Sequence, residues 1–330
     1  MTIPSDSPAA PSLTSQEIAA LLGAVIDVVS KRVIGQEPVI EQALVTFLAR
    51  GHALLEGVPG TAKTILVRAL AGALGMRFGR IQFTPDLMPA DITGISIIRD
   101  PAKGFEFQPG PVFTDLLLAD EINRAPAKTQ AALLEAMGER QVTADGDTRP
   151  LGELFTTFAT QNPVEYEGTY PLPEAQLDRF LIKIAVPYPS LEAELQMLDL
   201  YGSGFDAERA SDVVPDPVID TDQCRLLRSA VESVTVAPEV RDYVAAIVRA
   251  TREDSRLLLG GSPRATVALF RTARASALFN GRDFVTPDDV KDYAAPALRH
   301  RIRLAPELEV EGRRPDDVLT DIMSRIAAPR

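Results

Sequence analysis

The sequence predicts an α/β protein, with a mostly parallel sheet in its first part and an all-helical domain after it. Five short apolar runs alternate with helical or loop segments, at residues 52–56, 78–83, 115–119, 155–159 and 180–186. Strands that alternate with helices are joined by right-handed crossovers and therefore lie parallel. After Pro187 the strand-like runs stop, and helical patterns occupy the rest of the 330 residues.

Helical periodicity places the other elements. Before the first strand, apolar residues at helical spacing predict one helix with Ser15 as its N-cap and a second helix over 37–50. After the last strand, helices are expected over 190–200, 220–234, 238–253, 262–279 and 286–302. Asp220 and Gln223 fit a capping box, which supports a helix start at that point.

These patterns divide the chain into four parts, in line with the two domains that its length favours. Residues 1–12 are rich in Ser, Pro and Ala and are expected to form a disordered tail. We expect an α/β domain over 13–190 and a helical domain over 218–330. Residues 191–217, which begin helically and continue with Gly, Pro and Asp, are expected to connect them.

Composition and charge exclude several classes of function. The chain has 34 Lys and Arg against 46 Asp and Glu, a net charge of −12. This excludes a basic footprint over the whole chain for nucleic acid or an anionic membrane, but not a local basic channel. The single Cys224 excludes an intramolecular disulfide, and two distant histidines argue against a zinc site or a Ser-His-Asp triad. With no secretory signal and no apolar run of about 18 residues, we expect a cytoplasmic protein without membrane insertion.

A glycine-containing loop follows the first predicted strand and opens a helix. Its residues nearly match the phosphate-loop pattern and are Gly57, Val58, Pro59, Gly60, Thr61, Ala62, Lys63 and Thr64. In such a loop the backbone N–H groups and the helix N-terminus bind phosphates. Lys63 would reach the β- and γ-phosphates, and the Thr64 hydroxyl would ligate Mg²⁺. Ala62 stands where the pattern has Gly, and its methyl group fits if φ is negative. The alternative is a Gly-Pro turn before an ordinary helix.

Polar residues also follow two later strands. Asp120 and Glu121 end the apolar run LLLA, and Asn162 follows the run that ends at Ala159. We assign Asp120 to Mg²⁺, through water, and Glu121 to polarising the attacking water. The amide of Asn162 can orient that water. The alternatives are a solvated loop for the acidic pair and a simple Asn-Pro turn for Asn162.

Two arginines stand out by position. Arg179 lies just before the last strand, where it suits delivery to the γ-phosphate of a neighbouring subunit; a surface salt bridge is the alternative. Arg264 lies in the first turn of a helix that Ser262 and Pro263 begin. A cation there is unfavourable next to the positive end of the helix dipole, which suggests that it binds an anion from outside the helix. Pairing with a nearby acid is the alternative.

Taken together, these residues resemble those of AAA+ ATPases, and specifically of the MoxR family. GVPGTAKT resembles Walker A, LLLADEINRA Walker B, ATQNP sensor 1, LPEAQLDRF the arginine-finger segment and GSPRA sensor 2. The resemblance covers about residues 15–300, with the motifs in the family's order. It also includes Ile34 and Gly35, in a segment similar to the one that contacts adenine.

The resemblance implies a five-stranded αβα core, a helical lid and a ring, usually a hexamer, with ATP and Mg²⁺ as cofactors. It implies that Arg179 acts in trans, and it leaves open whether Arg264 acts in cis or in trans. Arg124 could approach a neighbour's nucleotide or cap its own loop. Segments 94–111 and 141–151 resemble inserts that face the ring pore in relatives; surface hairpins are the alternative.

Three functions compete. The first is an ATP-driven remodeller of proteins, which in this family often works with proteins that carry von Willebrand factor A domains. The second is a nucleic-acid motor, and the third a slow ATP-gated switch or scaffold. A strand-tracking hairpin needs Lys or Arg, yet 141–151 has Asp145 and Asp147 against Arg149 alone. Glu121 and Asn162 weigh against a switch that does not hydrolyse ATP. We therefore expect protein partners and no nucleic acid.

Overall fold

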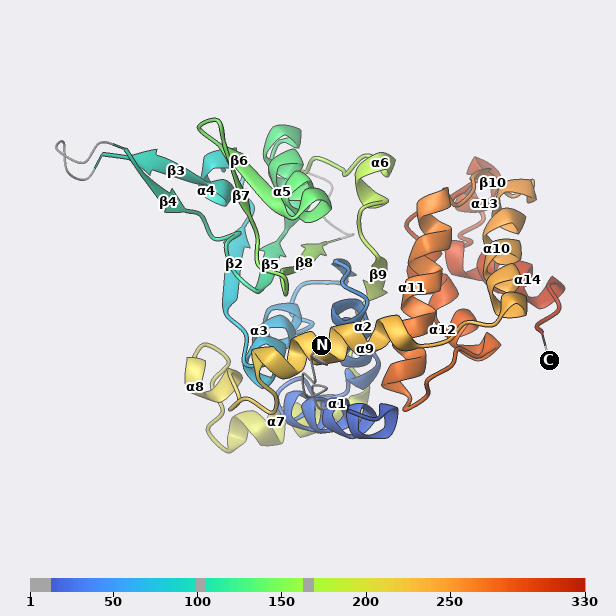
Figure 1. Cartoon of the computed structure of the whole chain (residues 1–330), viewed down its shortest axis with the longest axis horizontal. Helices are drawn as coiled ribbons and strands as arrows, with labels where there is room; N and C mark the ends of the chain where they lie inside the picture. The colour runs from blue at the N-terminus through green and yellow to red at the C-terminus, as the bar shows by residue number, and fades with distance from the viewer. Residues whose placement is uncertain (1–12, 99–104, 163–168, 330) are drawn as a thin grey trace, which may run out of the picture.

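A computed structural model describes residues 13–98, 105–162 and 169–329, and the expected tail 1–12 lies outside them. A parallel five-stranded sheet lies at the centre of the molecule, in the order β2-β5-β8-β1-β9 (Figure 1). Its strands are β1 (Ala53–Glu56), β2 (Phe78–Gln82), β5 (Leu116–Asp120), β8 (Thr156–Gln161) and β9 (Ile182–Ala185). All five lie at the predicted runs, so the parallel α/β core is confirmed.

Helices cover both faces of this sheet. One side is covered by α1 (Ser15–Ser30), α2 (Glu37–Leu48) and α3 (Lys63–Ala73), and the other by α4 (Pro89–Thr93) and α5 (Ala127–Glu139) (Figure 1). Alternation along β1 explains the two layers, because Leu55 joins the buried cluster of the first side and Leu54 that of the second. The short helices η1 (Ile122–Arg124) and α6 (Glu174–Leu177) follow β5 and precede β9.

Two antiparallel hairpins extend from the second side of the sheet. They are β3 (Gly94–Ile97) with β4 (Glu106–Pro109), and β6 (Gln141–Ala144) with β7 (Asp147–Pro150). Both lie in the segments expected as inserts. Asp145 and Gly146 form the tip of the second hairpin, both with positive φ, as a tight two-residue turn requires.

The rest of the chain is mainly helical and lies to one side and below the sheet in Figure 1. Its helices are α7 (Leu191–Gly202), α8 (Ala210–Val213), α9 (Thr221–Ser233), α10 (Pro238–Glu253), α11 (Pro263–Phe279), α12 (Pro287–Leu298), α13 (Pro306–Val310) and α14 (Pro315–Arg325). One buried cluster includes side chains from α1–α3 and from α9–α12. This buried cluster is continuous across residue 190. The division of the chain into two domains near that residue therefore stays a proposal. Among the described residues, no helix is long and apolar enough to cross a membrane.

The structure corrects two local expectations. The first helix is capped by Thr14, not Ser15, through a capping box with Glu17. Strands do occur after Pro187, because β10 (Leu257–Leu259) pairs antiparallel with β11 (Arg303–Leu304). Strands of three and two residues are too short to show a period-two pattern, so the sequence does not reveal them.

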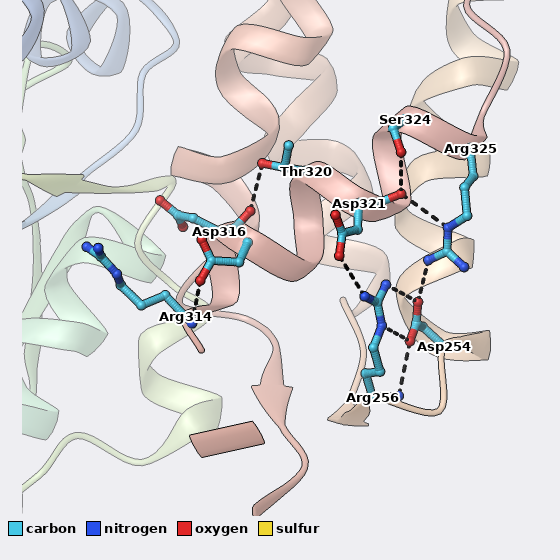
Figure 2. A network of polar contacts seen from close by, with 9 residues as sticks. Asp254, Arg256, Arg314, Asp316, Thr320, Asp321, Ser324 and Arg325 are labelled. Carbon is cyan, nitrogen blue, oxygen red and sulfur yellow. Dashed lines mark hydrogen bonds and ion pairs between the residues drawn. The ribbon is translucent and has the colours of Figure 1, made fainter. Parts of the chain in front are cut away.

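A network of ion pairs holds the end of the helical part together (Figure 2). Asp254, just after α10, accepts hydrogen bonds from Arg256 and Arg325, and Arg256 also reaches Asp321 at 2.8 Å. Hydrogen bonds from Arg256 and Arg325 hold the pKa of Asp254 well below its usual value. The network therefore attaches α14 to the turn that leads into β10.

Arginines also join the helical part to the core at the end of α2. Arg228 of α9 is fully buried and donates hydrogen bonds to the carbonyl oxygens of Phe47 and Glu153 and to the Thr156 hydroxyl. Arg271 of α11 donates to the carbonyls of Ala49 and Arg50. Cations at a helix C-terminus are favourable, and these contacts attach α9 and α11 to the carboxyl end of α2.

Acidification is expected to destabilise this fold through His52. The ring is fully buried: Nδ1 accepts the N–H of Thr157 at 2.9 Å, so Nε2 carries the proton and donates to the carbonyl of Met137 at 3.2 Å. Burial lowers the pKa of His52 from 6.5 to about 3. Between these values the unfolded chain binds more protons, so the free energy of unfolding falls as pH falls through this window, by at most about 1.4 kcal/mol per pH unit.

Urea unfolding from neutral to mildly acid pH measures this effect. The pH slope of the free energy of unfolding is expected to be smaller in His52→Gln than in wild type. Equal slopes in the two proteins would show that His52 does not cause the acid sensitivity.

Candidate nucleotide site

The predicted phosphate loop and the polar residues after β5 and β8 line one cavity of about 360 Å³. It lies at the carboxyl ends of the central strands, where parallel sheets bind ligands. The loop contributes Pro59 to Thr64, the strands contribute Asp120, Glu121 and Asn162, and α7 contributes Met197 and Tyr201. The structure thus brings together loop residues and acids that are more than 50 positions apart in sequence.

The loop needs small residues at defined points. A Cβ at Gly57 would lie 2.5 Å from the carbonyl oxygen of Val186, so only glycine fits the approach of β1 to the segment after β9. Gly60 has a φ of +82°. Val58 is part of the loop but does not line the cavity; its carbonyl accepts the hydroxyl of Thr61 at 2.9 Å.

Ala62 does not meet the condition, a negative φ, under which its methyl group was expected to fit. Its φ is +58°, in the left-handed region, immediately before α3 begins at Lys63. A left-handed residue other than glycine costs about 1–2 kcal/mol. The turn from loop to helix imposes this conformation, and such strain is typical of ligand-binding loops.

Lys63 lies folded over its own loop. Its ammonium donates to the carbonyls of Gly57 at 2.8 Å and Val58 at 2.7 Å. Burial lowers its pKa, while the charges of Asp120 and Glu121 oppose that shift. Thr64, the next residue, lies in the first turn of α3 and lines the same cavity.

The two carboxylates after β5 are held by different partners. Asp120 is buried and accepts the Thr160 hydroxyl at 2.7 Å and the Arg80 guanidinium at 2.7 Å. Glu121 has a φ of +56°, and its backbone N–H donates to Thr160 at 2.8 Å. Thr160 therefore fixes both residues, although it was not among the site residues predicted from the sequence. The feature that could have identified Thr160 is its position on β8, the strand beside β5.

The side chain of Glu121 points to residues outside the loop. It accepts a hydrogen bond from the Gln82 amide at 2.8 Å and forms an ion pair with the Arg124 guanidinium at 2.9 Å. Arg124 therefore contacts its own loop in this chain, which is the second of the two alternatives for this residue. Asn162 is buried at the end of β8 and lines the cavity beside Glu121.

Ile34 and Gly35 lie beyond the loop, next to α7. Ile34 lines a small cavity together with Gly60, Thr61 and Tyr201. Gly35 does not line that cavity, and its role is to allow close packing. Its φ is +72°, and a Cβ there would lie 2.5 Å from the Cβ of Ala193.

Arg179 and Arg264 line a different cavity, of about 510 Å³, between α11 and the segments that lead into β1 and β9. Six arginines line it: Arg50, Arg140, Arg179, Arg264, Arg271 and Arg301. Arg179 donates to the carbonyl of Leu134 at 3.1 Å. Arg264 is 66% exposed and lies 4.0 Å from Asp178, whose main partner is Arg301 at 2.7 Å. Neither arginine lines the phosphate cavity of its own chain within the described residues.

A phosphate loop on a parallel αβα sheet, followed by a helical lid, defines an AAA+ ATPase. Consistent with this, residues 52–182 match the family model described as "ATPase family associated with various cellular activities (AAA)". Residues 249–322 match the model of the AAA lid domain.

Known proteins define the family further. The chain is 45% identical to the YeaC protein of Bacillus subtilis, covering 95% of this chain and 97% of that protein. It is 42% identical to "Chaperone MoxR1" of Mycobacterium tuberculosis, covering 95% of this chain and 84% of that protein. A solved structure from Cytophaga hutchinsonii superposes with a TM-score of 0.86 at 41% identity, covering 96% and 97% of the two chains. The chain belongs to the MoxR family of AAA+ ATPases.

Proposed function

We propose that this protein hydrolyses ATP in a ring of its own copies, usually a hexamer in this family, to remodel or activate protein partners. The observation that carries the proposal is the single cavity that the phosphate loop, both carboxylates and Asn162 share. Backbone N–H groups of the loop and the N-terminus of α3 suit the phosphates, and the small cavity at Ile34 suits the adenine side.

The donor set in this cavity also fits Mg²⁺, because a threonine hydroxyl and a carboxylate are hard oxygen ligands. Thr64 and Asp120 would hold the ion, Asp120 partly through water. The ion neutralises charge on the β- and γ-phosphates when it is bound. Lys63 leaves its loop carbonyls for the phosphates, Glu121 accepts the proton of the attacking water, and Asn162 orients that water.

We further propose that Arg179 and Arg264 both act in trans. Among the described residues that line the phosphate cavity, Lys63 alone is positively charged. The two arginines line a common cationic cavity elsewhere. An arginine that stabilises the transferred phosphoryl group can come from another subunit. The location of both arginines in one cavity, away from the phosphate loop, favours the trans alternative for Arg264, which the sequence alone left open.

The partner is proposed to be a protein, with a von Willebrand factor A domain protein as the specific candidate. A relative at 42% identity carries the name chaperone. The hairpins β3–β4 and β6–β7 would contact the substrate. Phe105 is 75% exposed and could contact an apolar segment of the substrate. Phe107 packs edge-on against Phe113, with 5.8 Å between the centres of the two rings.

Lys63→Ala is expected to weaken ATP binding by about 10- to 100-fold, because it removes a charge-assisted contact with the phosphates. Titration calorimetry with Mg-ATP measures this loss. Lys128→Ala, on the exposed side of α5, is the matched control and should bind as wild type does. Unchanged affinity in Lys63→Ala would refute the loop assignment.

Single-stranded DNA is expected to leave ATP hydrolysis unchanged, even at low salt, where electrostatic binding is strongest. Arg149, the one basic residue between 141 and 151, is already engaged. It lies 3.9 Å from the centre of the Phe107 ring and 3.0 Å from the Asp147 carboxylate. Hydrolysis rates with and without DNA, across a salt series, test this. Stimulation that falls steeply with salt would favour the nucleic-acid motor instead.

A further inference from the structure

Helix α7 has its apolar side chains on the outside. Its buried residue is Ala193, which meets Gly35, while three of its four leucines are exposed and Leu200 is half-buried. Leu191, Leu195 and Leu198 are 74%, 54% and 69% exposed, and Tyr188 just before the helix is 71% exposed. The spacing 191, 195, 198 places the three leucines on one side of α7, and Tyr188 precedes the helix. A helix face in contact with water is normally polar, so this stripe indicates a missing partner.

The stripe continues into the nucleotide site. Tyr188 and Leu198 line an open cavity together with Pro59, Gly60 and Thr61 of the phosphate loop. Met197 and Tyr201 of the same helix line the phosphate cavity itself. Whatever covers the α7 stripe therefore lies next to the candidate nucleotide site.

A second set of exposed apolar residues surrounds Arg264. Val267, one turn further along α11, lines the cationic cavity with it and is 56% exposed. Leu259 of β10 lines an adjoining cavity that shares Asp178 and Arg301, and Leu258 beside it is also exposed. We name Leu258, Leu259 and Val267 the lid-edge patch.

The stripe and the lid-edge patch cannot meet within one chain. In Figure 1, α7 lies at the lower end beside α8, whereas α11 and β10 lie on the opposite side of the molecule. Their charges are complementary. Helix α7 carries Glu192, Glu194 and Asp199 with no basic residue. On α11, which has no acidic residue, Arg264 is 66% exposed, whereas Arg271 and Arg274 donate to carbonyl oxygens of their own chain.

We propose that the α7 stripe is the docking surface for the lid-edge patch of a second copy of this chain. The proposal rests on the trans role of the arginines given above. If Arg179 and Arg264 of one copy reach the phosphate cavity of the next copy, the lid-edge patch beside Arg264 comes to lie against the α7 stripe beside that cavity. The contact joins two different surfaces, so it is heterologous, and repetition generates a ring.

Two sets of variants test this. Leu191→Glu with Leu195→Glu breaks the stripe, and Leu258→Glu with Val267→Glu breaks the patch; none of these four side chains touches the phosphate cavity. The matched control is Leu226→Glu with Val310→Glu, which charges exposed apolar residues on α9 and α13. Sedimentation velocity is run with Mg²⁺ and a non-hydrolysable ATP analogue.

Each broken face is expected to weaken association by about 30-fold or more, as for loss of a central interface residue. Each variant should therefore be monomeric where wild type and control assemble. Mixing the two should yield dimers and no larger rings, because one intact stripe then meets one intact patch. That result is specific to a heterologous contact.

Other outcomes overturn the proposal. Assembly of the stripe variant as in wild type, or a monomeric wild type, would show that α7 does not bind a second copy. If the stripe variant is monomeric but the patch variant assembles, α7 pairs with itself or with another surface. If both assemble but lose stimulation by a protein partner, the stripe binds that partner. Arg179→Ala, run in parallel, tests the trans role separately, because it should assemble and fail only in hydrolysis.

Discussion

Arg179→Ala is expected to bind ATP almost as wild type does and to lose about 10³-fold or more in turnover, the range found for arginines that act in trans. In its own chain Arg179 contacts the carbonyl of Leu134 and does not line the phosphate cavity. Its removal should therefore leave the affinity for ATP intact. Calorimetry and steady-state hydrolysis separate the two effects, and Arg241→Ala on α10 is the control for loss of an arginine.

Mixing two inactive variants sharpens the test. A Glu121→Gln chain still offers its arginine to a neighbour, and an Arg179→Ala chain still offers a complete phosphate cavity. Mixed rings should regain part of the wild-type rate at interfaces where the two intact halves meet. No recovery despite demonstrated subunit exchange would indicate a role in cis, or a block that spreads around the ring.

Glu121→Gln is expected to bind ATP and to hydrolyse it about 10²- to 10⁴-fold more slowly, the usual loss when a general base is removed. Glutamine keeps the shape of the side chain and loses the carboxylate that accepts the proton. Because Glu121 lies in the left-handed region and is held there through Thr160, the backbone should not change.

Single-turnover hydrolysis and nucleotide affinity measure the two parts of this prediction. Glu135→Gln, an exposed position on α5, is the matched control and should hydrolyse ATP at the wild-type rate. A Glu121→Gln protein with wild-type turnover would assign the catalytic base to another residue.

The strands and the phosphate loop were predictable because their signals are local. The inner strands β1, β5 and β8 are buried on both faces, so they appear as apolar runs, and the loop is a short pattern at the end of one such run. The strands β10 and β11 were not predictable, because pairs of two or three residues leave no period. The positive φ of Ala62 could not be read from the sequence, because the turn geometry that forces it belongs to the loop as a whole.

The sequence by itself determined the class of fold, the phosphate loop and the residue types of the candidate site, since these depend on neighbours along the chain. Tertiary structure decided which of them share a cavity: Asp120, Glu121 and Asn162 join the loop, and Arg179 and Arg264 are grouped elsewhere. It also decided that Leu191, Leu195 and Leu198 of α7 face outward, since helical spacing shows that side chains share a face but not which face is covered. The physical reason is that burial and convergence arise from contacts between distant segments, and these exist only when the sheet and its helices pack.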